Sequence, residues 1–213
     1  MKNSKLQKSA AWIAAVVLVV AVCVLGTQLV KAARNESEIE IERMGEASLT
    51  RIWGPVLAVD GDRIHIDNRS GFGGQGEIVL MADSELTRVV NASDGLPADV
   101  SSLTADTPVF AYILPQMMMS EPPVVSAELI LCDIPADLRV PDYVYVRSVE
   151  QQPDGSYLLE SESGMQYLVP EDCEVMPYRT RNIVTLADIT QGSACVVWSD
   201  EHRTAQKILL FAA

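Results

Sequence analysis

The stretch RIWGPVLAVDGDRIHIDNRSG, residues 51–71, decides the fold class of this chain. Asp60 and Gly61 lie between two runs in which apolar and polar residues alternate. An Asp-Gly pair in that setting is the strongest short-range sequence signal for a β-hairpin. The pattern predicts strands over residues 51–59 and 62–68, each with one buried face, because alternation with a period of two is typical of half-buried strands.

More strand patterns of this kind follow up to residue 132. They are GEIVLMAD, ELTRVV, TPVFAYIL and VVSAELILCD, and they recur at spacings near ten residues with almost no helical periodicity. Six short strands with such spacing predict a small barrel or sandwich. Pro135 and Pro141 then bracket the segment IPADLRVP, which marks a boundary between modules.

After this boundary the same order of patterns returns. A second Asp-Gly hairpin signal lies in YVYVRSVEQQPDGSYLLESESG, followed by QYLV, CEVMPY, TLADITQGSACVVW and TAQKILLF. SSLTADTPVFAY aligns with ADITQGSACVVW without a gap, and SAELILC aligns with TAQKILL. We interpret the region as two copies of one unit, an all-β fold of two tandem small OB-like β-barrel modules over residues 49–134 and 140–213. The competing interpretation is that any two meandering β-domains share such alternation.

The alternation also predicts which side chains fill each module. For the first module the predicted core residues are Ile64, Ile66, Ile78, Leu80, Phe110, Tyr112, Ile130 and Cys132. For the second module they are Leu168, Val196, Trp198, Ile208 and Leu210.

The two copies differ mainly in the length of one hairpin. Thr204 follows Trp198 by six residues, whereas Ser126 follows the equivalent Tyr112 by fourteen, an extension of eight residues. Loops carried on a rigid scaffold are frequent binding sites. The candidate binding loop comprises Gln116, Met117, Met118, Met119, Ser120, Glu121 and Pro122.

Two alternatives to a binding loop concern the methionines. They could cover the end of the barrel as apolar packing, or their thioethers could hold Cu(I), which favours soft ligands. Adjacent residues of an extended chain point to opposite sides, and no histidine or cysteine lies nearby in the sequence. We therefore predict no metal site and no cofactor.

The N-terminus predicts a membrane anchor. Residues 10–30 contain no charged residue, and at ~1.5 Å per residue a helix of that length spans roughly 31 Å, close to the ~30 Å of a hydrocarbon core. Three lysines precede the segment, which favours a cytoplasmic tail over residues 1–9. The acidic residues 31–48 then form a stalk. A signal peptide cleaved near Ala32, with secretion of the remainder, is the alternative.

The charge of the exported part excludes one class of partner. Five of the 16 basic residues lie before Asn35, which leaves 11 basic against 29 acidic residues and a formal charge of −18. Nucleic-acid binding depends on Lys and Arg that neutralise phosphates, so we predict no nucleic-acid partner. An envelope protein or a glycan is the expected partner, beside the membrane itself.

Candidate catalytic residues are few. The chain has two histidines, His65 on a solvent face and His202 in a short turn, and neither lies in a nucleophile motif. A pair of carboxylates could serve a hydrolase, but the sequence fixes no distance between them. Cys173 and Cys195 could form a disulfide, or they could be buried free thiols.

Residues 54–145 resemble secreted or membrane-anchored proteins of anaerobic Gram-positive bacteria. The segments GLP, VFAYI, the Met and Pro-Pro run, and AELILCDIPAD carry this resemblance. Some of those proteins also contain domains named after the N-terminal region of copper amine oxidases, but this chain has no copper-site motif. The resemblance implies an envelope location and no activity, since the family has none established.

These observations together predict a single-pass protein of the cell membrane with its C-terminal region outside. We expect a non-catalytic binding or scaffolding module that makes contacts through the methionine loop. The competing class is an extracytoplasmic hydrolase that uses carboxylates. A third class is a sensor that passes ligand occupancy across the membrane, although a tail of nine residues is short for signalling.

Overall fold

The structure, a computed structural model, describes residues 49–83, 85–118, 120–179 and 183–211. The predicted tail (1–9), membrane span (10–30) and stalk (31–48) lie outside the described residues. Within the described ranges, no helix has both the length and the apolar character that a membrane crossing requires.

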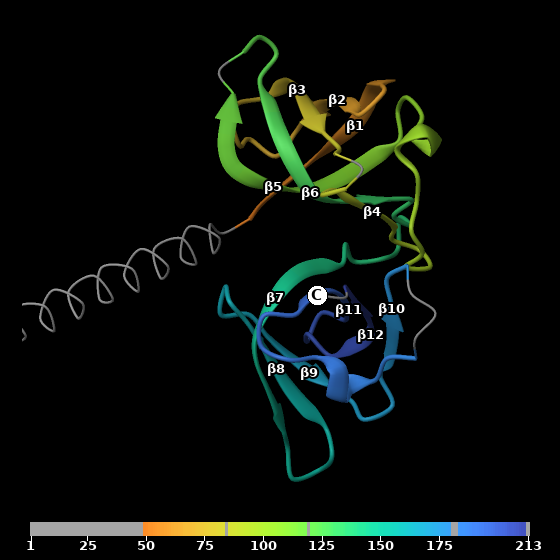
Figure 1. The fold of residues 1–213 in the computed structure, drawn as a ribbon, viewed down its shortest axis with the longest axis vertical. Coiled ribbons are helices and arrows are strands. Elements are labelled where there is room, and N and C mark those ends of the chain that lie inside the picture. The colour runs from red at the N-terminus through yellow and green to blue at the C-terminus, as the bar shows by residue number, and fades with distance from the viewer. Residues whose placement is uncertain (1–48, 84, 119, 180–182, 212–213) are drawn as a thin grey trace, which may run out of the picture. The chain divides into compact units, whose positions relative to one another are not determined.

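The described chain is all-β, with its strands in two six-stranded sheets (Figure 1). The first sheet contains β1 (Thr50–Asp60), β2 (Arg63–Asn68), β3 (Gly76–Met81), β4 (Arg88–Asn91), β5 (Pro108–Met118) and β6 (Val124–Cys132). The second contains β7 (Asp142–Gln151), β8 (Tyr157–Ser161), β9 (Gln166–Val169), β10 (Glu174–Pro177), β11 (Ala194–Ser199) and β12 (Ala205–Leu210). Two one-turn 3₁₀ helices, η1 (Val100–Ser102) and η2 (Leu186–Asp188), precede β5 and β11.

Five strands of the first sheet close into a barrel. The order is β3-β2-β1-β5-β6-β4, and an additional parallel pairing of β3 with β6 joins the two sides. β4 lies outside the closed ring and pairs with β6 in parallel. Closure removes the free edges that an open sheet of this size would expose.

The second sheet has the same strand order, read as β9-β8-β7-β11-β12-β10. Its parallel pair of β10 with β12 corresponds to that of β4 with β6. Here, however, β9 meets the chain before β12 only through a single parallel bridge, between Leu168 and Thr204. The two sheets therefore differ in how completely their sides are joined.

Both predicted Asp-Gly hairpins are confirmed. β1 pairs with β2 and β7 pairs with β8, both antiparallel, around turns in which Gly61 has a φ of 62° and Gly155 a φ of 89°. A glycine adopts these positive φ values without the steric cost that a Cβ would impose.

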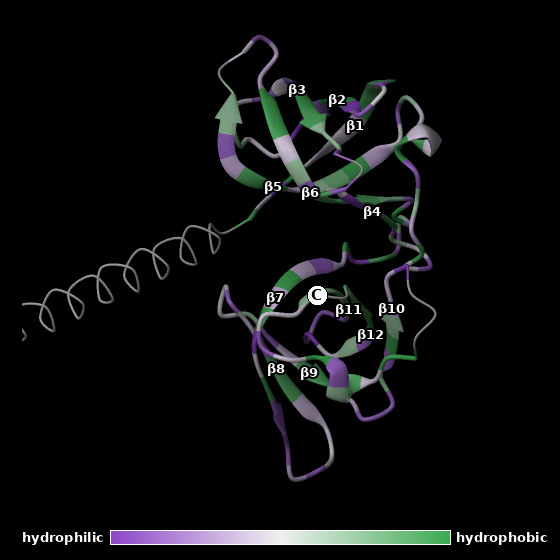
Figure 2. Ribbon diagram, viewed as in Figure 1, coloured by the Kyte–Doolittle hydropathy of each residue, from purple (hydrophilic) through white to green (hydrophobic). Residues whose placement is uncertain are grey.

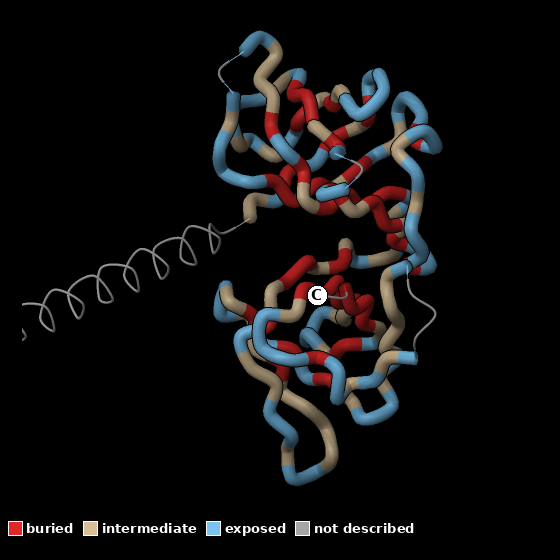
Figure 3. The backbone as a smooth tube through the Cα atoms, viewed as in Figure 1, coloured by how far each residue is buried: buried red, intermediate tan, exposed pale blue. Residues whose placement is uncertain are grey.

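Buried side chains form three clusters. Buried and hydrophobic segments occur along the strands of both sheets, whereas most connections between strands are exposed (Figures 2 and 3). One cluster fills the first barrel, and a second lies inside the second sheet. The third contains residues of both sheets, among them Val90, Tyr112, Leu131, Val196 and Trp198. A third apolar cluster of this kind was not predicted from the sequence.

The third cluster corrects part of the predicted core. Ile64, Ile66, Ile78, Leu80, Ile130, Cys132, Ile208 and Leu210 lie inside the two sheets as expected. Tyr112, Val196 and Trp198 are buried, but in the third cluster, because Val109, Ala111, Ile113, Cys195 and Val197 take the interior face. Phe110 is only partly buried beside the third cluster, and Leu168 is 44% exposed.

Candidate functional site

The predicted binding loop proves shorter than expected, because β5 continues through its first residues. Gln116, Met117 and Met118 belong to β5. Met117 pairs with Val125 and Met118 with Val124, after irregular register around Ile113. The methionine run is therefore mainly a continuation of a strand, and the connection between β5 and β6 begins after Met118.

This continuation takes part in closing the barrel. Val124 and Val125, which pair with the methionines on one side, pair on the other side with Val79 and Leu80 of β3. The Val79 N–H also donates to the carbonyl oxygen of Pro123 at 2.9 Å. The sequence interpretation placed this extension outside the shared core, and the structure corrects it: the longer hairpin supplies pairing that joins β3 to β6.

Neighbouring methionines have different surroundings. Met117 is partly buried and packs against the interior cluster of the first barrel, as the packing alternative expected. Met118 is 61% exposed. Met119 lies outside the described residues. A strand presents successive side chains to opposite sides, so Met117 and Met118 do not converge on one point.

A glycine-rich loop between β2 and β3 lies against the partly buried Met117. A Cβ built at Gly73 would lie 2.5 Å from Cε of Met117. Asn68, which is 1% exposed, donates to the carbonyl oxygens of Phe72 (2.8 Å) and Gly74 (2.7 Å) and accepts from Ser70. These bonds hold the loop in place, because a buried amide with all its partners satisfied is costly to move.

Ser120 shapes the connection itself. Its N–H donates to the carbonyl oxygen of Met118 at 2.9 Å, and its Oγ donates to that of Pro122 at 2.8 Å. The peptide bond between Glu121 and Pro122 is cis. The exposed Met118 thioether thus lies beside a short turn that the Ser120 hydrogen bonds organise.

The described residues give no support for a metal centre. No group of three or more His, Cys, Asp or Glu side chains with metal-binding geometry occurs among them. Among the described residues next to the methionine run in the sequence, Glu121 is the acidic one.

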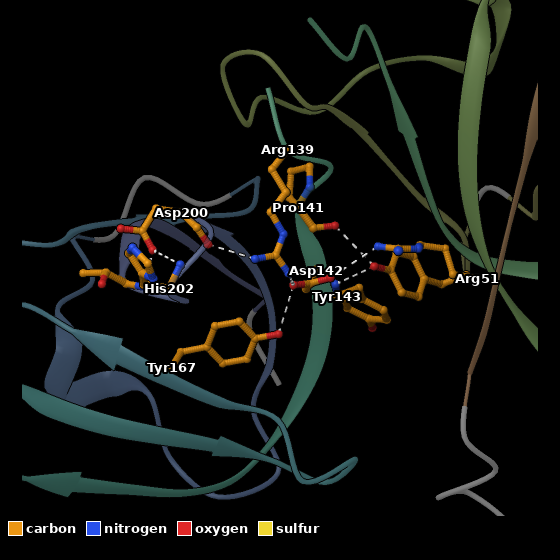
Figure 4. Close-up of polar contacts among 10 residues, drawn as sticks. Arg51, Arg139, Pro141, Asp142, Tyr143, Tyr167, Asp200 and His202 are labelled. Carbon is orange, nitrogen blue, oxygen red and sulfur yellow. Dashed lines mark hydrogen bonds and ion pairs between the residues drawn. The ribbon is translucent and has the colours of Figure 1, made fainter. Parts of the chain in front are cut away.

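Tertiary structure brings together a polar cluster that sequence reasoning missed (Figure 4). The carboxylate of Asp142, at the start of β7, forms ion pairs with Arg51 of β1 at 3.3 Å and with Arg139 at 3.0 Å. It also accepts a hydrogen bond from the Tyr167 hydroxyl at 3.2 Å. Arg139 also donates to the carbonyl oxygen of Asp200 at 2.8 Å. The Asp142 side chain is 14% exposed, and these donors compensate the loss of water around its charge. No sequence signal could have indicated it, because Arg51 and Asp142 are 91 positions apart.

A second cluster joins Glu128 of β6 to β7. Glu128 accepts hydrogen bonds from the hydroxyls of Tyr143 (2.6 Å) and Tyr145, and Arg88 lies 3.7 Å away. Burial first, and then the charge of Glu128, raise the pKa of Tyr143 well above its ordinary value. Burial likewise raises the pKa of Tyr145. The two hydroxyls thus stay protonated and serve as donors.

The candidates for catalysis do not form a reactive arrangement. His65 lies 2.6 Å from Glu77, and His202 is 80% exposed, with its backbone N–H bonded to Asp200. Where the pKa of a described carboxyl group shifts clearly, at Asp99, Asp154 and Asp200, hydrogen bonds lower it. A general acid needs the opposite shift.

The cysteines of the described region are free thiols. Cys132 and Cys195 are buried and Cys173 is partly buried, and no bridge joins Cys173 to Cys195. Burial raises the pKa of Cys132 and of Cys195 to about 12 and that of Cys173 to about 11. Thiols with such values are poor nucleophiles near neutral pH.

Comparison with known proteins adds no relative. No family model matches the chain, and no curated protein matches it either.

Proposed function

We propose that this protein is a non-catalytic binding or scaffolding module of the cell envelope, anchored in the membrane by residues 10–30. In this proposal the β5–β6 hairpin makes the contact with an envelope protein or glycan. The uncharged run over residues 10–30, with Lys2, Lys5 and Lys8 before it, supports an extracytoplasmic location for the residues that follow.

The observation that carries the proposal is the contrast between Met117 and Met118. Met117 is fixed against the barrel interior, whereas Met118, the next residue, is 61% exposed. An apolar, polarisable side chain held at a defined place on a rigid strand is a favourable contact for a partner surface. The Asn68-organised loop and the pairing to β3 keep this end of the barrel in one conformation.

The finer architecture is also part of this proposal: the two sheets are tandem copies of one OB-like module. Their identical strand order, and the parallel pairing of β4 with β6 and of β10 with β12, support duplication. Binding in OB-folds commonly uses the loop that corresponds to the β5–β6 connection. In the second sheet the equivalent turn is short, so the first module carries the contact.

The test is capture of envelope components by the full-length chain in a mild detergent. The variant Met118→Ser should lose the captured component, while Leu86→Ser, which removes an apolar side chain that is 71% exposed elsewhere, should retain it. Both changes leave the core intact, unlike a shortened hairpin, which would also remove Met117 from the barrel interior. Equal capture by Met118→Ser and the unmodified protein would refute the assignment of the hairpin.

A further inference from the structure

We propose a second binding surface, on the outer face of β1 and β5, that takes a pyranose ring of a polysaccharide. Its centre is Trp53, whose side chain faces away from the barrel interior and is 37% exposed. Phe110 lies directly opposite on β5, with ring centroids 5.9 Å apart and ring planes 16° from parallel. This surface is distinct from the β5–β6 hairpin and does not rest on the function proposed for it.

The aromatic pair is held in place by its surroundings. Phe110 packs against the third apolar cluster, and the guanidinium of Arg51 lies 6.0 Å from its ring centroid. The carbonyl oxygen of Trp53 accepts from the N–H of Arg69 at 2.9 Å, which ties β1 to the chain after β2. A ring oriented before binding loses little conformational freedom when a ligand stacks on it.

Charged groups border the aromatic pair. On the β2 side Arg69 bonds Asp67 through both Nε and an Nη at 3.1 Å, and the two side chains are 55% and 38% exposed. Arg51, two residues before Trp53 on β1, lies near the Phe110 ring and also pairs with Asp142. A sugar ring has a C–H face that packs on an indole and hydroxyls at its rim that accept from guanidinium and donate to carboxylate. The patch therefore has groups suited to both kinds of contact.

The equivalent position in the second sheet shows that the fold does not require this exposure. The aligned registers make Trp53 the counterpart of Tyr143, because Trp53 pairs with Phe110 and Tyr143 pairs with Val196. Tyr143 is 6% exposed and belongs to the third cluster. The same outer face is therefore covered in the second sheet, while Trp53 stays accessible in the first.

Other occupants fit the patch less well. A protein partner needs about 800 Å² on each side, far more than one indole and a half-covered phenyl ring bordered by charges. A nucleic-acid base could stack on the indole, but the formal charge of −18 in the region from Asn35 onward opposes a phosphate backbone. A neutral ring with polar edges remains the best match.

The test is co-sedimentation of the full-length chain with insoluble polysaccharides, in a detergent that has no sugar headgroup. Peptidoglycan sacculi and chitin provide N-acetylated rings, and cellulose provides unsubstituted ones. We expect retention on at least one of these, weakened about tenfold by Trp53→Ala, as for loss of a stacked ring. Trp53→Phe should keep most of the binding, and Leu57→Ser, an exposed apolar position on the same strand, should keep all of it.

Arg69→Ala gives an independent readout if Trp53→Ala folds poorly. This substitution removes only an exposed side chain, and it should also weaken retention on the polysaccharide. Met118→Ser should bind polysaccharide normally, so failure of this surface and failure of the hairpin are distinguishable. The proposal is overturned if none of the three polysaccharides retains the protein. It is equally overturned if the Trp53 and Arg69 variants bind as well as the unmodified chain.

Discussion

Trp198 in β11 donates its indole N–H to the backbone carbonyl oxygen of Ala92 at 2.7 Å, across 106 positions of sequence. Its counterpart in the first sheet, Tyr112, also bonds to backbone of the other sheet: its hydroxyl donates to the carbonyl oxygen of Pro141 at 3.2 Å and accepts from the N–H of Tyr143 at 3.0 Å. Equivalent positions of the two aligned segments thus supply the polar contacts of the third cluster.

Trp198→Phe should lower the free energy of unfolding by about 1–3 kcal/mol, because it leaves a buried carbonyl oxygen without its donor. Urea unfolding, followed by far-UV circular dichroism, measures this change. The matched control is Trp53→Phe, at an exposed position, with an expected change within about 0.5 kcal/mol. Equal effects of the two substitutions would contradict the role of the Trp198 hydrogen bond.

The two methionines at the end of β5 should respond differently to truncation. Met117→Ala removes a side chain packed on the barrel interior and should lower the free energy of unfolding by about 1–2 kcal/mol. This loss lies at or below the lower end of the range for fully buried methionines, because Met117 is only partly buried. Met118→Ala should change stability by less than about 0.5 kcal/mol. Thermal unfolding of both variants tests the assignment, and a larger loss at Met118 would reverse it.

Gly54 lies where β1 approaches the backbone of β2 closely. A Cβ at this position would meet the carbonyl oxygen of Asp67 at 2.0 Å, and backbone cannot move aside as a flexible side chain can. We expect Gly54→Ala to destabilise the protein by about 3 kcal/mol or more. Gly71→Ala is a suitable comparison: a Cβ there meets nothing within 4 Å, so only its φ of 82° opposes the change. Chemical denaturation should rank Gly54→Ala as the more damaging.

Alkaline pH should reduce the stability that the contact between Glu128 and Tyr143 contributes. The folded state holds the Tyr143 proton more tightly than the unfolded chain does, because burial and the Glu128 charge raise its pKa above 10.0. The stability from this group is therefore complete below about pH 10 and declines as the pH rises further. In urea titrations between about pH 9 and pH 11, Tyr143→Phe should show a shallower decline than the unmodified protein. Identical pH slopes would exclude the coupling.

Labelling of thiols tests the cysteine assignments. Near pH 8 the folded protein should react slowly with iodoacetamide at Cys132 and Cys195, where burial raises the pKa to about 12. Cys173, which is partly exposed, should react first among the three. After denaturation without reductant, all four cysteines of the chain should become labelled. Two that require prior reduction would instead reveal a Cys173–Cys195 bridge.

Much of the strand arrangement could be predicted, because it depends on local signals. The first Asp-Gly turn and the alternation around it place β1 and β2 within one residue of their observed ends, and the second Asp-Gly turn places the hairpin of β7 and β8. The alignment of SSLTADTPVFAY with ADITQGSACVVW likewise anticipates that β5 and β11 occupy the same place in two sheets of identical order.

The sequence misassigned the two faces of β5 and β11. Both faces of these strands are largely apolar and buried, one toward a sheet interior and one in the third cluster. Alternation therefore does not tell which face points into the sheet interior. The candidate loop was misread for a related reason. Whether Gln116–Met118 pair with β6 depends on how β3 and β6 meet, and no local pattern encodes that contact.

By itself, the sequence determined that residues from about 50 onward form β-hairpins in a repeated order, since turn chemistry and a period of two act over neighbouring residues. Only the tertiary structure decided that Tyr112 and Trp198 form hydrogen bonds to backbone groups of the other module, and that Asp142 pairs with two arginines. The exposure of Trp53 was likewise decided by the tertiary structure. These outcomes depend on which surfaces cover one another, and burial of that kind links residues whose separation in sequence is far greater than any local period.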